Sequence, residues 1–150
     1  MSDRVAVLHQ GRLQQIDSPA TIYERPRNTF IADFVGNHNL LPAKVMDTKG
    51  CLLLQNSDPA AFIKLPLPDG VRVGQEVKLA LRPEALALAP RQGNGEVPGR
   101  ILCTLYRGRE VEYLVAVGQD KIRILTPGRA SWMPGQEVDI KINEGLVFLA

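Results

Sequence analysis

The sequence predicts a mainly β protein, a small closed barrel or a sandwich, and two observations carry this prediction. From about Leu41 onward, short apolar runs recur between Gly, Pro, Asp and Asn residues, at the spacing of short strands and turns. No long helical period follows Gly36. The predicted strands are residues 43–46, 51–54, 77–81, 85–88, 99–106, 112–117, 121–125 and 138–142.

Ahead of this region, residues 5–16 predict a β-hairpin. Val5, Val7 and Leu8 precede the pair Gln10-Gly11, and further apolar residues follow it. This alternation suits a half-buried sheet, and Gly11 supplies the positive φ that a tight turn requires.

Two short helices are expected next. Ser18-Pro19 is a helix start, because the Ser oxygen accepts from an early backbone N–H and Pro has its φ already set. Pro26 disfavours helical geometry in the residue before it, so this helix ends around Arg25. Asn28 is expected to cap a second helix, which Gly36 ends as a left-handed cap.

The β region also contains an internal repeat. Residues 74–79, GQEVKL, recur 61 positions later as GQEVDI at 135–140. Each copy is a turn followed by an alternating strand, and each precedes an acidic residue and another apolar strand. The repeat predicts two related half-barrels that bury a shared core.

Composition restricts the function. The chain has 150 residues, 18 Lys plus Arg against 16 Asp plus Glu, and a net charge of +2, which gives no reason to expect a nucleic-acid or membrane-surface partner. No apolar run approaches the roughly 20 residues of a transmembrane helix. Neither a signal peptide, a phosphate-binding GxxxxGK[ST] loop nor a GxSxG nucleophile motif occurs.

The sequence therefore predicts no catalytic, cofactor or metal site in this chain. His9 and His38 have no obvious chemical partners in the sequence. Cys51 and Cys103 lie in strand-like patterns without a CxxC, and we expect both to be small buried or half-buried hydrophobes in a reducing compartment.

The first 41 residues resemble the end of the ATPase domain in bacterial ABC importers of the polyamine, iron, sulfate and maltose class. The matching motifs are Ser2-Asp3-Arg4, Gln10-Gly11-Arg12, Ser18-Pro19, Ile22-Tyr23-Glu24-Arg25-Pro26, Ala32-Asp33-Phe34-Val35-Gly36 and Asn39-Leu40-Leu41. The family's ATP-binding and catalytic motifs would all lie before residue 1.

The β region resembles the domain that follows in these subunits, the transport-associated oligomer-binding-type (TOBE) domain. Arg82-Pro83-Glu84 after an alternating strand is similar to its Arg-Pro-Glu segment, and residues 99–108 with Glu112-Tyr113 are similar to its next strands. The family's Leu-Gly step is replaced here by Arg107-Gly108.

This resemblance implies a TOBE-like double barrel of the oligomer-binding (OB) type, preceded by the hairpin and two helices. Residues 1–40 would be a remnant of the ATPase domain and 41–150 the regulatory barrel. The implied partners are the chain's own ATPase domain, a second copy of the subunit and membrane permeases, on the cytoplasmic face of the inner membrane. ATP and Mg would belong to the full-length subunit. The motifs of this chain look most like the spermidine/putrescine branch, and phosphonate and iron importers are the next most similar.

The candidate interface or regulatory residues are Arg82, Glu84, Arg107, Arg109 and Trp132. Arg82 and Glu84 are expected either to pair across a barrel rim or to contact the ATPase domain or the second subunit. Arg107 and Arg109, with Lys121 and Arg123, form either a solvated face or an anion site. Trp132 with Met133 is either an exposed contact surface or a buried loop anchor.

Two other hypotheses stay open. A free-standing OB-like module would capture a small oxyanion or an oligonucleotide, but it would have no use for residues 1–36. The apolar residues there, Val5, Val7, Ile22, Phe30 and Phe34, suggest a larger partner. The second hypothesis is that the chain is an intact small subunit that acts without a fused ATPase.

Overall fold

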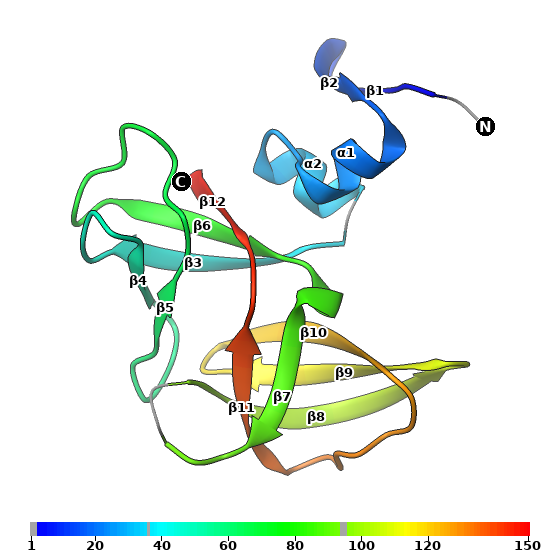
Figure 1. Ribbon diagram of the computed structural model, residues 1–150, viewed down its shortest axis with the longest axis vertical. Helices are drawn as coiled ribbons and strands as arrows, with labels where there is room; N and C mark the ends of the chain where they lie inside the picture. Colours follow the sequence, from blue (N-terminus) through cyan, green and yellow to red (C-terminus); the bar gives the residue numbers. More distant parts are fainter. Residues whose placement is uncertain (1–2, 36, 94–95) are drawn as a thin grey trace.

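A computed structural model describes residues 3–35, 37–93 and 96–150 of the chain. A small N-terminal unit of one hairpin and two helices stands beside two five-stranded antiparallel sheets, which hold most of the residues (Figure 1). The mainly β prediction is confirmed.

The N-terminal hairpin forms where the sequence predicts it. Strand β1 (Val5–His9) pairs with β2 (Arg12–Asp17), and the turn residues Gln10 and Gly11 have φ values of 50° and 73°. Positive φ at both central residues is the geometry whose twist matches two-residue hairpins, and Gly11 adopts it without a steric cost.

The two helices begin at the predicted caps. Helix α1 (Pro19–Glu24) starts after Ser18, whose hydroxyl accepts from the Thr21 N–H at 3.2 Å. Helix α2 (Thr29–Phe34) starts after Asn28, whose side-chain oxygen accepts from the Ile31 N–H at 3.0 Å. The predicted cap at Gly36 lies outside the described residues.

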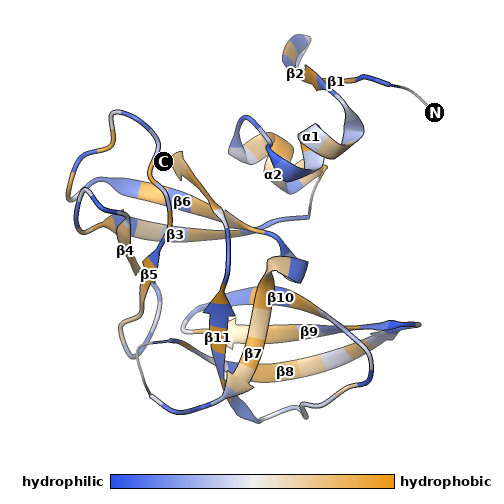
Figure 2. Ribbon diagram, viewed as in Figure 1, coloured by the Kyte–Doolittle hydropathy of each residue, from blue (hydrophilic) through white to orange (hydrophobic). Residues whose placement is uncertain are grey.

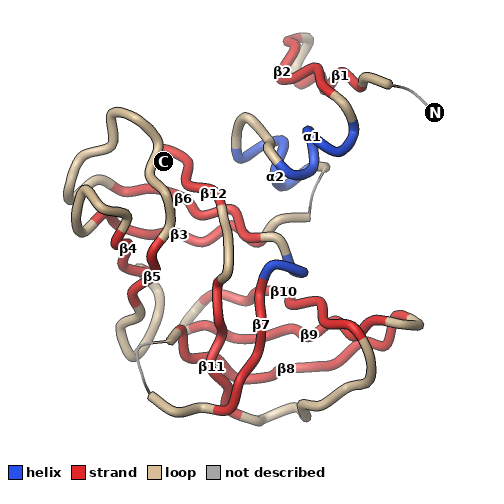
Figure 3. Tube along the Cα trace, viewed as in Figure 1, coloured by secondary structure: helices blue, strands red, loops and turns tan. Residues whose placement is uncertain are grey.

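The ten remaining strands build two sheets with the orders β12-β6-β3-β4-β5 and β10-β9-β8-β11-β7 (Figure 3). Every strand predicted from the sequence is present, and β5 was missed because it has only three residues, one of them buried. The bounds are β3 (Asn39–Val45), β4 (Cys51–Leu54), β5 (Phe62–Lys64), β6 (Glu76–Leu81), η1 (a 3₁₀ turn, Pro83–Ala85), β7 (Leu86–Pro90), β8 (Val97–Arg107), β9 (Glu110–Val117), β10 (Asp120–Pro127), β11 (Glu137–Ile142) and β12 (Leu146–Leu149).

The internal repeat is confirmed at the level of single hydrogen bonds. In the first copy, the Gln75 carbonyl accepts from Val45 N–H at 3.0 Å, and Gly74 N–H donates to the Val45 carbonyl at 2.7 Å. In the second copy, Gln136 and Gly135 make the same two bonds with Ile101, at 2.9 and 2.7 Å. Strand β6 is therefore the equivalent of β11, and β3 is the equivalent of β8.

The two halves exchange their last strands. Strand β7 follows β6 in the chain but pairs with β11, and β12 follows β11 but pairs with β6. One hydrophobic cluster includes buried residues of both sheets, so the shared core is confirmed. The closed double barrel is corrected to two open OB-like sheets, because the strand that would remain in each half crosses to the other.

The N-terminal unit has a small core of its own, formed by Val7, Ile22 and Ile31. Apolar residues also lie along the hairpin and α2 (Figure 2), and several of them are exposed to solvent. Phe34 stacks on Phe30 with ring centroids 5.6 Å apart, yet it is 70% exposed. The other exposed large apolar residues of this unit are Val5, Leu8, Leu13, Ile16 and Val35.

Candidate functional site

The candidate site lies where the helices of the N-terminal unit meet the crossover from β6 to β7. Arg82 and Glu84 flank Pro83 at this crossover, and their side chains pair at 3.9 Å, which is one of the two arrangements that the sequence left open. Glu84 also accepts a 2.5 Å hydrogen bond from the hydroxyl of Tyr23 on α1. Arg82 further pairs with Glu144, on the equivalent crossover from β11 to β12. We call Tyr23, Arg82, Glu84 and Glu144 the junction cluster.

The junction cluster perturbs the titration of Tyr23. Burial raises the pKa of its hydroxyl to about 12, and the hydrogen bond to Glu84 together with that carboxylate's charge acts in the same direction, while Arg82 opposes them. Tyr23 therefore stays protonated and donates to Glu84 across the whole physiological pH range.

His38 lies buried beside this cluster. Its Nδ1 lies 3.0 Å from the Ala32 carbonyl oxygen, so Nδ1 carries the proton, and its ring centroid is 5.7 Å from that of Tyr23. Nε2 has no hydrogen-bond partner among the described residues. Burial lowers the pKa of His38, the Ala32 bond and Glu84 oppose this, and Arg82 adds to it. Glu24 and Glu144 line the same small cavity.

Asn39 joins the two sheets next to His38. It lies at the start of β3 and is 8% exposed. Its carboxamide accepts from the N–H of Arg123 on β10 and donates to the carbonyl of the same residue, both at 2.8 Å. Since β10 is an edge strand, this side chain takes the place of a neighbouring strand.

The predicted basic face is partly neutralised by one buried carboxylate. Glu112 on β9 is 8% exposed, and Arg107 bonds to its Oε2 at 2.9 and 3.1 Å. Arg123 approaches its Oε1 at 3.7 Å and donates to the Asn37 carbonyl at 2.9 Å. These residues line a groove of about 280 Å³ together with Tyr23 and Glu84. Two of the four cations predicted for an anion site therefore have carboxylate partners.

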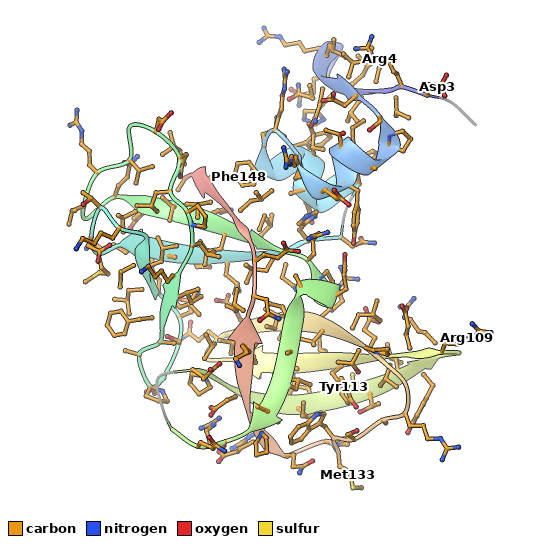
Figure 4. All side chains as sticks on the ribbon, in the orientation of Figure 1. Asp3, Arg4, Arg109, Tyr113, Met133 and Phe148 are labelled. Carbon is orange, nitrogen blue, oxygen red and sulfur yellow. The ribbon has the colours of Figure 1, made fainter. Side chains whose placement is uncertain are left out.

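The other two candidate residues lie elsewhere. Arg109 occupies the turn between β8 and β9 and points away from the body of the protein (Figure 4). Trp132 is half-buried against the shared core, so it is a loop anchor, while the neighbouring Met133 is 72% exposed. The structure thus brings Arg82, Glu84 and Arg107 to one side of the sheets and leaves Arg109 and Trp132 out.

Sequence reasoning missed Tyr23, His38, Asn39, Glu112 and Glu144 as site residues. Tyr23 and Asn39 stand inside the motifs that carried the family resemblance, which was the available signal. Their partners lie 61 and 84 positions away, so the sequence could not name them.

The arrangement couples structural elements rather than presenting reactive groups. Among the described residues no group of three or more His, Cys, Asp or Glu side chains lies together as a metal site. Cys51 and Cys103 are unpaired and half-buried. No helix in the described ranges is long and apolar enough to span a membrane.

Comparisons with known proteins agree with this architecture. Residues 79–149 match the family described as TOBE domain. The chain is 34% identical over 149 residues to the spermidine/putrescine import ATP-binding protein PotA of Pseudomonas fluorescens, which covers 99% of this chain and 40% of that protein. It is 35% identical over 122 residues to PotA 1 of Pseudomonas aeruginosa, covering 81% of this chain and 33% of that protein. The chain thus spans less than half the length of these relatives.

A solved structure with a similar fold is that of the cytoplasmic molybdate-binding protein ModG with molybdate bound. It superimposes with a TM-score of 0.55 and 14% identity, over 75% of this chain and 96% of that one. At this identity the similarity supports the OB-type fold alone.

Proposed function

We propose, from the premise that this chain carries a TOBE domain and is homologous to the C-terminal part of ABC importer ATP-binding subunits, that it is the regulatory and dimerisation end of such a subunit. The single observation that carries the proposal is the similarity to these subunits over 99% of the chain. Polyamines are the best-supported cargo class of the whole transporter, with phosphonate and iron behind them.

Residues 1–40 fit the end of an ATPase domain, and residues 41–150 fit the regulatory domain. The exposed apolar side chains of the hairpin and α2 support this division, because the solvent-exposed surface of a soluble protein rarely has so many large apolar residues on one small unit. The rest of the ATPase domain would cover them. That domain would also bind ATP and Mg, which this chain is not proposed to hold.

The physical role follows from the junction cluster. The bond between Tyr23 and Glu84 joins the helical unit to the β domain, so a displacement of one is resisted by the other. If two copies pair through their β domains, that contact persists when the ATPase domains separate, and it raises their effective concentration for closing again. A difference in how the paired domains fit the open and closed states would then bias the transport cycle.

The partners in this proposal are the ATPase domain, a second copy of the subunit and membrane permeases, at the cytoplasmic face of the membrane. An immunoblot of source cells with an antibody against residues 42–150 tests it. A band far heavier than 16.5 kDa supports the proposal, and a band at 16.5 kDa contradicts it. Deleting residues 42–150 from the heavier protein should then reduce assembly or the control of transport.

A free-standing module that binds an oxyanion is the alternative, and it is kept because the solved structure of similar fold, ModG, is a molybdate-binding protein, although the similarity itself shows the fold alone. Two of the four predicted cations, however, already pair with Glu112. Calorimetric titration of this chain with molybdate separates the two proposals, since tight binding by the isolated chain supports only the alternative.

A further inference from the structure

The two halves of the β domain meet at two equivalent places, which we call seams. At each seam the edge strand of one sheet faces the first strand of the other sheet, and the two seams are filled differently. At the first seam, β10 faces β3, and the Asn39 carboxamide fills the gap by bonding to both backbone groups of Arg123. At the second seam, β5 faces β8. Here the structure has a cleft of about 380 Å³, lined by Phe62, Lys64, Val97 and Ile142 among others.

Strand registers identify Lys64 as the equivalent of Arg123. Lys64 pairs with Cys51 and Arg123 pairs with Leu114. Cys51 and Leu114 are themselves equivalent, because each lies next to a residue with an equivalent partner. Leu52 pairs with Val45, Val115 pairs with Ile101, and Val45 and Ile101 are equivalent in the repeat. The two edge strands thus present matching backbone positions to the two seams.

The backbone of Lys64 is directed away from its own sheet. Leu54 N–H donates to the Ala61 carbonyl and Leu65 N–H donates to the Gly50 carbonyl, at 3.0 Å each. In an antiparallel ladder bonded and non-bonded positions alternate, so residues 61, 63 and 65 face β4 while residue 64 faces outward. As β5 is an edge strand, no further strand covers this side within the described ranges.

The sequence has no Asn at the position equivalent to Asn39. Asn39 stands two positions before Leu41, which is equivalent to Val97 because Leu41 pairs with Leu79 and Val97 with Ile140. Two positions before Val97 the sequence has Gly95, which has no side chain. Among the described residues, no side chain bonds to the backbone N–H or C=O of Lys64 in the way that Asn39 bonds to Arg123.

We propose that the cleft between β5 and β8 is a peptide-binding site. It takes an extended segment of a partner protein that carries an Asn side chain, whose carboxamide bonds to the N–H and C=O of Lys64 as Asn39 bonds to Arg123. The apolar lining residues Phe62, which is 52% exposed, and Ile142 contact an apolar neighbour in the segment. Lys64 and Lys141 outnumber Glu96 in the lining, which selects an acidic flanking residue. Its volume is within the roughly 300–1,000 Å³ of ligand sites, and strand addition supplies the binding mode.

Amide exchange on the isotope-labelled 150-residue chain gives the first test. We expect the Arg123 N–H to exchange slowly and the Lys64 N–H to exchange fast. The blocked peptide Ac-Asp-Asn-Leu-NH₂ should then slow exchange at Lys64 and shift the resonances of Lys64, Val97 and Ile142. Protection of Lys64 before any peptide is added would overturn the proposal, because the cleft would already be filled.

A matched peptide and two variants complete the test. Ac-Asp-Leu-Leu-NH₂ lacks the carboxamide and should bind at least tenfold more weakly, and equal binding of the two peptides overturns the proposal. Lys64→Pro removes the outward N–H at a position where an edge strand tolerates proline, so it should fold and lose the preference for Asn. Lys64→Ala keeps the N–H and should keep that preference. If the proline variant does not fold, the peptide pair still decides.

Discussion

The hydroxyl of Tyr23 donates a 2.5 Å hydrogen bond to Oε1 of Glu84, across 61 positions of sequence. One residue belongs to a six-residue helix and the other to the crossover that carries the chain from one sheet to the other. The bond therefore connects the N-terminal unit to the segment whose path defines the exchanged topology. The contribution of this bond to the free energy of unfolding, and the dependence of that contribution on pH, can both be measured.

Replacing Tyr23 by Phe removes this bond and leaves the ring in place. We expect a loss of about 0.5–1.5 kcal/mol in the free energy of unfolding, which is typical of one hydrogen bond. The folded pKa of about 12 exceeds the unfolded value of 10.0, so the contribution of Tyr23 is complete below pH 10 and is lost as the pH rises from 10 to 12. Urea unfolding at pH 8 and above pH 10 checks both. Tyr106→Phe is the control, since Tyr106 is 75% exposed, and an equal loss there would contradict the prediction.

His38 predicts a dependence on pH in the acidic range. Its folded pKa lies below the unfolded value of 6.5, so above pH 6.5 both states are neutral and the full stability is present. As the pH falls below 6.5, the unfolded state takes up the proton first and stability decreases. His38→Asn keeps a donor near the Ala32 carbonyl and removes the titrating group, so it should flatten urea-unfolding stability between pH 7 and pH 5.

The other histidine provides the control for this experiment. His9 is exposed, and its ring contacts that of Phe30 in a tilted arrangement with a centroid distance of 4.0 Å. His9→Asn should leave the loss of stability below pH 6.5 in place. If His38→Asn shows the same acid-induced loss as the unmodified chain, another group causes it.

Local chemistry in the sequence was sufficient for the hairpin, for the two helices and for every strand except the three-residue β5. Ser18 and Asn28 cap their helices because the cap bond spans only three positions, and the Gln10-Gly11 turn is equally local. The GQEV repeat located the two equivalent strands β6 and β11. Each of these features depends on neighbours in the chain, which a single sequence displays.

The exchange of the last strands and the junction cluster were not predictable in this way. After β6 the chain reads as a strand, a proline and another strand, whether or not the second strand stays in the same sheet. Long-range contacts such as Asn39 with Arg123 decide the candidate site, and one sequence contains no signal that pairs them.

Glu112 should stabilise the fold more than an exposed carboxylate with a similar partner. Glu112→Gln leaves Arg107 and Arg123 without their shared charge beside a buried position, and we expect a loss of about 1–3 kcal/mol. Glu137→Gln is the matched control, because Glu137 pairs with Arg100 at 3.6 Å on the surface and should cost about 0–1 kcal/mol. Urea unfolding at low salt measures both. Equal losses would mean that burial of Glu112 adds nothing.

Gly118 tests whether the β9–β10 turn is fixed against the other sheet. Its φ is +57°, and a Cβ there would lie 1.5 Å from the Asn56 carbonyl oxygen. The same carbonyl accepts from the Gln119 N–H at 3.2 Å, and the Asn56 amide donates to Asp120 at 3.2 Å. Gly118→Ala must therefore displace backbone as well as adopt a strained φ, and we expect it to cost about 3 kcal/mol or more.

Gly108 separates these two effects. Its φ is +71°, but a Cβ there meets no atom within 4 Å, so Gly108→Ala carries the cost of the positive φ alone, about 1 kcal/mol. Urea unfolding should show the difference, and faster amide exchange at Gln119 in Gly118→Ala alone should show that the turn has left Asn56. The turn between β9 and β10 contacts Asn56, which follows β4 of the other sheet. Its release should therefore loosen the contact between the two sheets before either sheet unfolds. Equal stabilities of the two alanine variants would place the turn free of the neighbouring sheet and contradict this.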